Sequence, residues 1–209
     1  MYARFNLNPE NRNWSEYINT GRSIHRKNKE QIEFSLDKFK NADESLDAQK
    51  IIDNWFPEIK ADVFLSHSHK DENTVIGFAG WLKEAFGLDS FMDSEVWGYS
   101  DDLLKAIDDK YCRNNCCGTY NYEMRNRSTS HVHMILSTAL MNMIDKCECI
   151  IFMNTPNSYK PKEYFEDEGR TESPWIYSEI AMTKMLRQRS ILEHRPQLTM
   201  EGFKVIAKG

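Results

Sequence analysis

The stretch ADVFLSHSHKDENTVIGFAGWLKEAFGLDSFMD, residues 61–93, decides the fold. It begins with a short apolar segment, 61–65, that ends abruptly in small, polar and ionisable residues. A second strand pattern at 88–92 ends at Asp93. Between the two, apolar side chains recur at helical spacing until Gly87, at Val75, Phe78, Ala79, Leu82, Ala85 and Phe86. The order strand, helix, strand predicts parallel strands joined by a crossover helix.

The remaining chain continues this alternation. Amphipathic patterns predict helices at about residues 100–111 and 132–143, and the apolar run at 149–153 predicts a central strand buried on both faces. Ser173 and Pro174 suit a helix cap and a first helical position, so a further helix is expected to begin there and to run to about residue 189. The predicted fold class is therefore α/β, a mostly parallel sheet with helices on both faces.

Residues 1–60 are expected to form a helical N-terminal extension packed on the domain, because two apolar stripes within them follow helical spacing. The core domain is expected to span residues 61–209, with an insertion at about 112–130 where polar residues interrupt the pattern. The loop at 154–172 is long for a compact domain, and loops of this length are usually functional or mobile. A last strand is expected at 203–207.

Composition restricts the partners of the protein. The formal net charge of −5, without a basic stripe, argues against a protein that binds nucleic acid through its phosphates. The first residues lack the apolar run of a secretory signal, and no stretch approaches the ~20 apolar residues of a membrane span. The protein is therefore expected to be soluble and cytoplasmic, with no membrane partner.

The cysteines favour packing roles over disulfides or a metal site. There are 5 of them, and an odd number without an export signal argues against a disulfide framework. A metal site could be built from three cysteines and two histidines, which are Cys112, Cys116, Cys117, His131 and His133. The spacing of these five residues matches no common zinc pattern. No metal site is therefore expected.

Ionisable and polar residues gather at one edge of the predicted sheet. The segments 66–71, 93–99 and 154–172 each follow a strand, and the carboxyl ends of parallel strands meet at the same edge. The next helix starts from that edge and carries Trp175 and Glu179 four residues apart on one face. A carboxylate on a mostly apolar helix surface has a large desolvation penalty unless it has a partner or a task. Glu179 is therefore the leading candidate for a catalytic residue.

Three stretches together resemble the TIR (Toll/interleukin-1 receptor) domain family: DVFLSHSHKD at 62–71, FMD with its following loop at 91–93, and SPWIYSEI at 173–180. Their order and spacing carry the resemblance, which covers roughly residues 61–190. The resemblance implies a flavodoxin-like sheet. A complete TIR domain normally continues with another strand and helix, so it also implies that the C-terminal end of this chain is truncated or divergent.

The same resemblance implies an activity, because many TIR domains cleave NAD at the bond between nicotinamide and ribose. Glu179 matches the catalytic glutamate of the W-x-x-x-E pattern, and Trp175 would form a wall of the pocket. NAD is the expected substrate, and no resident cofactor is expected. The residues expected to bind the substrate are Ser66, His67, Ser68, His69, Lys70, Asp93, Trp97, Tyr99 and Trp175.

Structural roles remain open for several of these residues. Glu179 could instead bind backbone groups or an arginine, and Trp175 could belong to the core. Asp71 could serve only as the cap of the helix that follows it. His67 and His69 alternate along an extended chain, so at most one of them is expected to face a ligand.

The leading hypothesis is an NAD glycohydrolase or ADP-ribosyl cyclase or transferase acting in bacterial antiphage defence, as TIR proteins of the Thoeris type do. Its nucleotide product would activate a separate effector protein, and self-association would complete its site. Two alternatives remain. One is a non-catalytic TIR scaffold that acts through homotypic contacts, and the other is a nucleoside deoxyribosyltransferase-like enzyme, which would also use a glutamate.

Overall fold

Within the part of the chain that the structure describes, four parallel strands form one sheet in the order β1-β4-β2-β3. The computed structural model describes residues 1–9, 12–30, 47, 50, 60–94, 103–114, 118–158, 174–190 and 193. The strands are β1 (Ala3–Leu7), β2 (Val63–Ser66), β3 (Ser90–Met92) and β4 (Cys149–Met153). The sheet confirms the predicted α/β class and is consistent with a flavodoxin-like fold.

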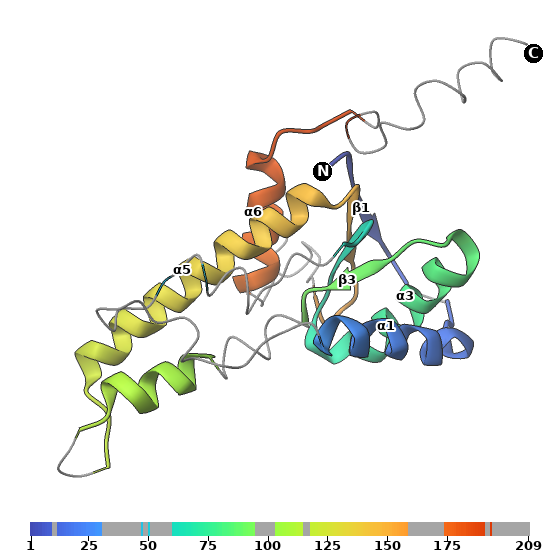
Figure 1. Cartoon of the computed structure of the whole chain (residues 1–209). Coiled ribbons are helices and arrows are strands. Elements are labelled where there is room, and N and C mark those ends of the chain that lie inside the picture. The colour runs from blue at the N-terminus through green and yellow to red at the C-terminus, as the bar shows by residue number, and fades with distance from the viewer. Residues whose placement is uncertain are drawn as a thin grey trace, which may run out of the picture.

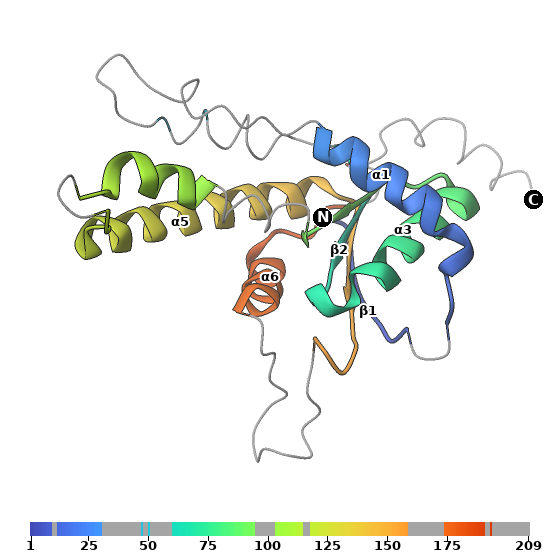
Figure 2. The same cartoon turned by 90° about the horizontal axis from the view of Figure 1, so that it is seen from below.

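Helices cover both faces of this sheet. Figures 1 and 2 show α1 and α3 on one side of the strands and α5 and α6 on the other. The longer helices are α1 (Ile18–Glu30), α3 (Glu72–Phe86), α5 (Tyr122–Lys146) and α6 (Pro174–Met185). Shorter helical segments are the 3-10 turns Ser15–Tyr17 and His69–Asp71, residues 103–107, and the π-helix Asp108–Cys112.

Alternate residues of β2 face these two layers. Val63 and Leu65 belong to a buried cluster with α3, whereas Phe64 belongs to a second cluster with α5 and α6. Successive side chains of a strand point to opposite faces, so a continuous apolar run becomes buried on both sides. This confirms the prediction that residues 61–93 form a strand, a helix and a second strand. The second strand, β3, begins at Ser90, two residues later than expected.

Helix α1 packs against α3 at a distance that only glycine allows. A Cβ atom on Gly21 would lie 1.8 Å from the carbonyl oxygen of Ile76, and one on Gly80 would lie 2.1 Å from that of Tyr17. Both distances are far inside van der Waals contact, so the missing side chains let the two helix backbones touch. This contact holds α1 firmly on the sheet domain.

Strand β1 corrects the expectation of a purely helical N-terminal extension. It pairs in parallel with β4, with Ala3 opposite Cys149 and Leu7 opposite Met153. Its sequence alternates polar and apolar residues and leaves Phe5 54% exposed, so it lacks the apolar run that marks a central strand. A flavodoxin-like sheet has the strand order 2-1-3-4-5. Counted from the β3 edge, the strands here follow the order β3, β2, β4, β1. The strands β3, β2 and β4 thus correspond to the first three positions of the flavodoxin-like order, and β1 occupies the fourth.

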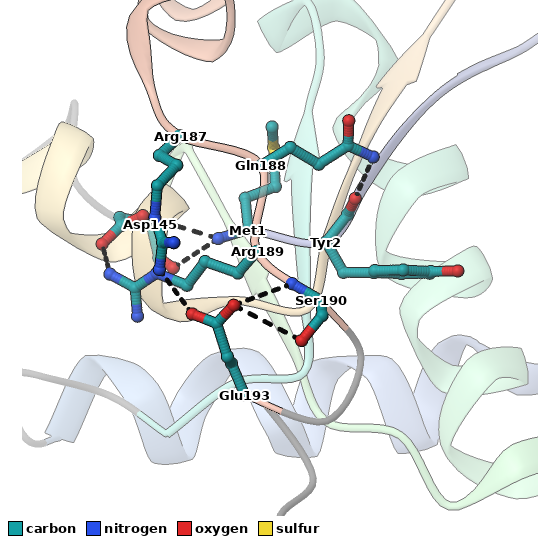
Figure 3. A network of polar contacts seen from close by, with 8 residues as sticks. All are labelled: Met1, Tyr2, Asp145, Arg187, Gln188, Arg189, Ser190 and Glu193. Atoms are coloured by element: carbon teal, nitrogen blue, oxygen red, sulfur yellow. Dashed lines mark hydrogen bonds and ion pairs between the residues drawn. The ribbon is translucent and has the colours of Figure 1, made fainter.

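A polar network at the N-terminus fixes β1 in this place (Figure 3). The Met1 ammonium donates to the carbonyl oxygen of Asp145 at 2.7 Å and lies 3.5 Å from its carboxylate, which also pairs with Arg189. The Gln188 side chain donates to the carbonyl oxygen of Tyr2 at 2.7 Å. The network joins the start of β1 to the end of α5 and to the segment that follows α6.

Other element boundaries differ from the expected ones. Helix α5 begins at Tyr122, inside the segment 112–130 that was expected to be an insertion, and Asn121 caps it by accepting from the backbone N–H of Met124 at 3.0 Å. The first turns of α5 are mostly exposed, which explains their polar sequence. Helix α6 begins at Pro174 as expected but ends at Met185.

Several expectations fall outside the described residues. They are the strand at 203–207 and the two apolar stripes within residues 1–60, which consist of Ile32, Leu36 and Phe39 and of Ala48, Ile51, Ile52 and Trp55. The domain boundary at residue 60 stays a prediction. In the described part of the chain, no helix combines the length and the apolar character that a membrane crossing requires.

Candidate active site

Four of the predicted site residues meet at the carboxyl edge of the sheet. Ser66 is the last residue of β2, and His67 follows it. Asp93 follows β3, and Glu179 lies in the second turn of α6. All four side chains are buried, and contacts link them in two pairs: Ser66 with Glu179, and His67 with Asp93.

Glu179 is fully buried, and only one of its two carboxyl oxygens accepts a hydrogen bond from a described residue. Its Oε2 accepts a hydrogen bond from the Ser66 hydroxyl, while its Oε1 has no hydrogen-bond partner among the described residues. Burial and then the negative charge of Asp93 raise the pKa of the Glu179 carboxyl well above its usual value, and the Ser66 hydrogen bond opposes this shift. An unpaired buried carboxyl oxygen is unfavourable, which points to a ligand group or a proton at this atom.

The His67 imidazole and the Asp93 carboxylate lie in contact, buried near Glu179. Nδ1 of the imidazole lies 2.6 Å from Oδ1 of the carboxylate, and the His67 backbone N–H donates to Oδ2 at 3.2 Å. Burial lowers the pKa of the His67 imidazole, but the charge of Asp93 and its contact with the ring outweigh burial, so the pKa is raised. The other ring nitrogen, Nε2, is buried and has no partner among the described residues.

The structure separates the two histidines of the loop after β2. His67 is buried against Asp93, whereas His69 is exposed in the 3-10 turn that leads into α3. The two side chains therefore lie in different environments, and the expectation that at most one of them faces a ligand stays a prediction. Ser68 is half-buried, and Lys70 is exposed next to His69, so these residues lie at the rim of the buried cluster.

Three aromatic residues of the predicted site are not placed by the structure. Trp97 and Tyr99 lie outside the described residues, and so does the side chain of Trp175, although its backbone belongs to α6. Their expected roles in the pocket stay predictions.

Asp71 has a role that its sequence position did not suggest. It stands at the N-cap position of α3, but its side chain makes no capping hydrogen bond there. Its carboxylate instead accepts from the Thr155 hydroxyl at 2.5 Å and from the Asn157 amide at 2.8 Å. Asp71 therefore ties the loop after β2 to the segment after β4. The signal that could have suggested this contact is the polar residues that follow the apolar run at 149–153.

Within the described residues, no group of three or more His, Cys, Asp or Glu side chains is arranged to hold a metal ion. Cys112 is buried, and its thiol contacts the Ser128 hydroxyl at 3.7 Å. His131 and His133 are exposed on α5. Cys116 and Cys117 lie outside the described residues.

Fold and site together define an α/β protein with a parallel sheet and a buried Ser, His, Asp and Glu cluster at its carboxyl edge. No protein-family model, curated protein or solved structure matched this chain. A buried carboxyl group with one oriented and one unpaired oxygen is suited to accepting hydrogen bonds from ligand hydroxyls and to stabilising nearby positive charge.

Proposed function

We propose that the protein cleaves NAD at the bond between nicotinamide and ribose, with Glu179 as the catalytic carboxylate. The observation that carries this proposal is the unpaired Oε1 of the fully buried Glu179, whose Oε2 is held by Ser66. The W-x-x-x-E pattern and the resemblance of residues 61–190 to TIR domains support the same reaction.

The chemistry needs little more than one well-placed carboxylate. When the glycosidic bond breaks, nicotinamide leaves as a neutral ring with the bonding electron pair, so no general acid is required. Positive charge develops on the ribose, as in glycoside hydrolysis. An ionised Glu179 stabilises that charge and accepts hydrogen bonds from ribose hydroxyls, and its burial makes both interactions stronger than they are in water. The Ser66 hydroxyl keeps the carboxylate from rotating away.

The acceptor that replaces nicotinamide determines the product. Water gives ADP-ribose and a proton, whereas a second nucleophile gives a cyclised or conjugated ADP-ribose. The proposal includes the second outcome, in which the product is a signal for a separate effector protein in antiphage defence. The TIR resemblance supports this part of the proposal.

Access to Glu179 requires a conformational step. The side chain has no surface exposed to solvent, so NAD reaches Oε1 only after neighbouring groups separate. A closed resting state keeps NAD intact until a trigger opens the site. Self-association is the trigger we propose, because a neighbouring subunit can stabilise the open edge and exclude water from it.

Incubation of the purified protein with NAD, followed by chromatography of the products, tests the proposal. Release of nicotinamide is expected, together with ADP-ribose or a derivative of it. The Glu179→Gln variant keeps the size of the side chain but removes its charge, and we expect its rate to fall at least about a hundredfold. Glu123→Gln, which changes an exposed glutamate at the start of α5, is the matched control and should keep full activity.

Two results would contradict the proposal. One is the absence of nicotinamide release at all protein concentrations, which would favour the scaffold alternative. The other is near-normal turnover by a folded Glu179→Gln variant, which would move the chemistry to another residue. Transfer of deoxyribose between bases without NAD cleavage would favour the deoxyribosyltransferase-like alternative.

A further inference from the structure

The Asp93 carboxylate makes two contacts with His67, the residue that directly follows β2, and so restrains the end of that strand. Its Oδ2 accepts from the backbone N–H of His67 at 3.2 Å, and its Oδ1 lies 2.6 Å from the imidazole Nδ1. The side chains of His67 and Asp93 are 0% and 2% exposed. Because His67 directly follows Ser66, these contacts also restrain the residue whose hydroxyl orients Glu179.

The same cluster contains two carboxyl groups that influence each other. Asp93 and Glu179 are both buried, and the charge of Asp93 acts on Glu179. Two neighbouring carboxylates in a medium of low dielectric constant do not both ionise readily. A cation paired with one of them removes this obstacle for the other. The imidazole of His67 is in contact with Asp93 and is the group placed to supply that cation.

We propose that His67 and Asp93 form a positioning pair for Glu179, in which the imidazolium cancels the charge of Asp93 and so allows Glu179 to be ionised during NAD cleavage. The inference rests on the proposed function. It assigns to His67 and Asp93 a role different from direct contact with the phosphates or ribose of the substrate. It also gives a reason for burying an ion pair, which by itself contributes little to stability.

The other charged groups around the cluster do not replace His67. From α3, Glu72 acts on His67 and favours its charged form. From β1, Arg4 reaches α6 but contacts the carbonyl oxygen of Thr183 at 3.4 Å. Lys184, on α6 itself, is exposed. Among the described residues, none of these groups forms an ion pair with Glu179.

The pH dependence of NAD cleavage tests the pair, because the acidic limb of the rate profile reports ionisation of the cluster. His67→Asn leaves Asp93 without its cation, so the limb should move to higher pH by about one unit or more. Asp93→Asn removes the negative charge beside Glu179, so the limb should move to lower pH. The double variant should lie between the two single variants. His131→Asn, which changes an exposed histidine on α5, is the control and should leave the profile unchanged.

The proposal would be overturned if the acidic limb of the pH–rate profile moved in the same direction in His67→Asn and Asp93→Asn. It would also be overturned if the limb did not move in folded variants. A merely structural role would lower the rate at every pH without moving the limb. Circular dichroism establishes that each variant is folded. The wild-type protein supplies a test that needs no variant: nitrogen NMR of labelled histidine should show the pKa of His67 raised above its ordinary value of 6.5, and an unraised pKa would refute the pair.

A second readout separates this inference from the proposed function. The carboxyl carbon of Glu179, identified in carbon NMR by comparison with Glu179→Gln, reports its titration without any substrate. If no NAD is cleaved, the proposed function fails, but the carboxyl titration should still move up in His67→Asn and down in Asp93→Asn. If NAD is cleaved and this titration does not move, only the positioning pair fails.

Discussion

The Ser66 hydroxyl donates a hydrogen bond to Oε2 of Glu179, joining two residues that are 113 positions apart in the chain. The bond connects the carboxyl end of β2 to the second turn of α6. It therefore fixes one oxygen of the carboxyl group, while the other has no hydrogen-bond partner among the described residues.

Ser66→Ala should reduce the proposed NAD cleavage more than it reduces stability. Without the hydroxyl, Glu179 loses its orienting donor and rotates more freely. A hydrogen bond to a charged group contributes about 1.5–3 kcal/mol, so the turnover rate should fall roughly ten- to a hundredfold. Steady-state kinetics and thermal melting measure the two effects. Ser130→Ala, which changes an exposed serine of α5, is the control, and a Ser66→Ala enzyme as fast as that control would contradict the prediction.

Replacing Glu179 should stabilise the folded protein at neutral and alkaline pH. The folded-state pKa of this carboxyl is raised above its ordinary value of 4.5, mainly by burial. Such a group contributes stability that is fully present below pH 4.5 and is lost as the pH rises through the folded-state pKa. Glutamine does not titrate, so Glu179→Gln should melt at a higher temperature than wild type at pH 8.

The difference in melting temperature between Glu179→Gln and wild type should shrink as the pH falls toward 4.5. Differential scanning calorimetry across this range gives the measurement. Glu123→Gln, at an exposed position, should show no comparable pH-dependent gain. A variant at residue 179 that is less stable than wild type at pH 8 would mean that Glu179 is a stabilising structural carboxylate.

Gly80→Ala should strongly destabilise the protein by separating α1 from α3. Its Cβ would lie 2.1 Å from the carbonyl oxygen of Tyr17, a backbone atom that cannot rotate away. Forced repacking of this kind costs on the order of 3 kcal/mol. Gly118→Ala is the comparison, because it meets no atom within 4 Å and carries only the strain of its positive φ of 67°, about 1–2 kcal/mol. Equal midpoints for the two variants in urea unfolding would refute the tight helix contact.

Specific activity should rise with protein concentration if self-association opens the site. The reason is the complete burial of Glu179, which closes the site in the single chain. Nicotinamide release per molecule is measured over a range of concentrations and with a crowding agent, while light scattering gives the oligomeric state. Full specific activity in a sample that scatters as a monomer would exclude this form of activation.

The fold could be predicted where local pattern and final environment agree. The apolar run at 149–153 became the interior strand β4, and the helical spacing after Asp71 became α3. Strand β1 could not be predicted in this way. Its five residues alternate in polarity and receive their place from pairing with β4, far along the chain. Similarly, the exposed first turns of α5 lack the apolar stripe that reveals a helix.

For the candidate site, the meeting of its residues at one sheet edge could be predicted, but the contacts between individual side chains could not. The rule that parallel strands end at one edge brought Ser66, His67, Asp93 and Glu179 together correctly. Which side chains contact each other depends on how α6 is rotated and on which residue follows the end of each strand. Spacing within one segment carries no information about either. For this reason capping of α3 stayed open as a role for Asp71, although its carboxylate makes no such cap and accepts a hydrogen bond from Thr155.

The position of β1 in the sheet has a consequence for synthesis on the ribosome. Ala3 pairs with Cys149, so β1 waits for 146 further residues to be made before its partner exists. At about 5–20 residues per second, this delay lasts roughly 7–30 s. Throughout that time a nascent strand carrying Phe5 has an unpaired edge, which is a template for aggregation. Translation speed and chaperone binding during these seconds should therefore decide how much of the newly made protein reaches the native sheet.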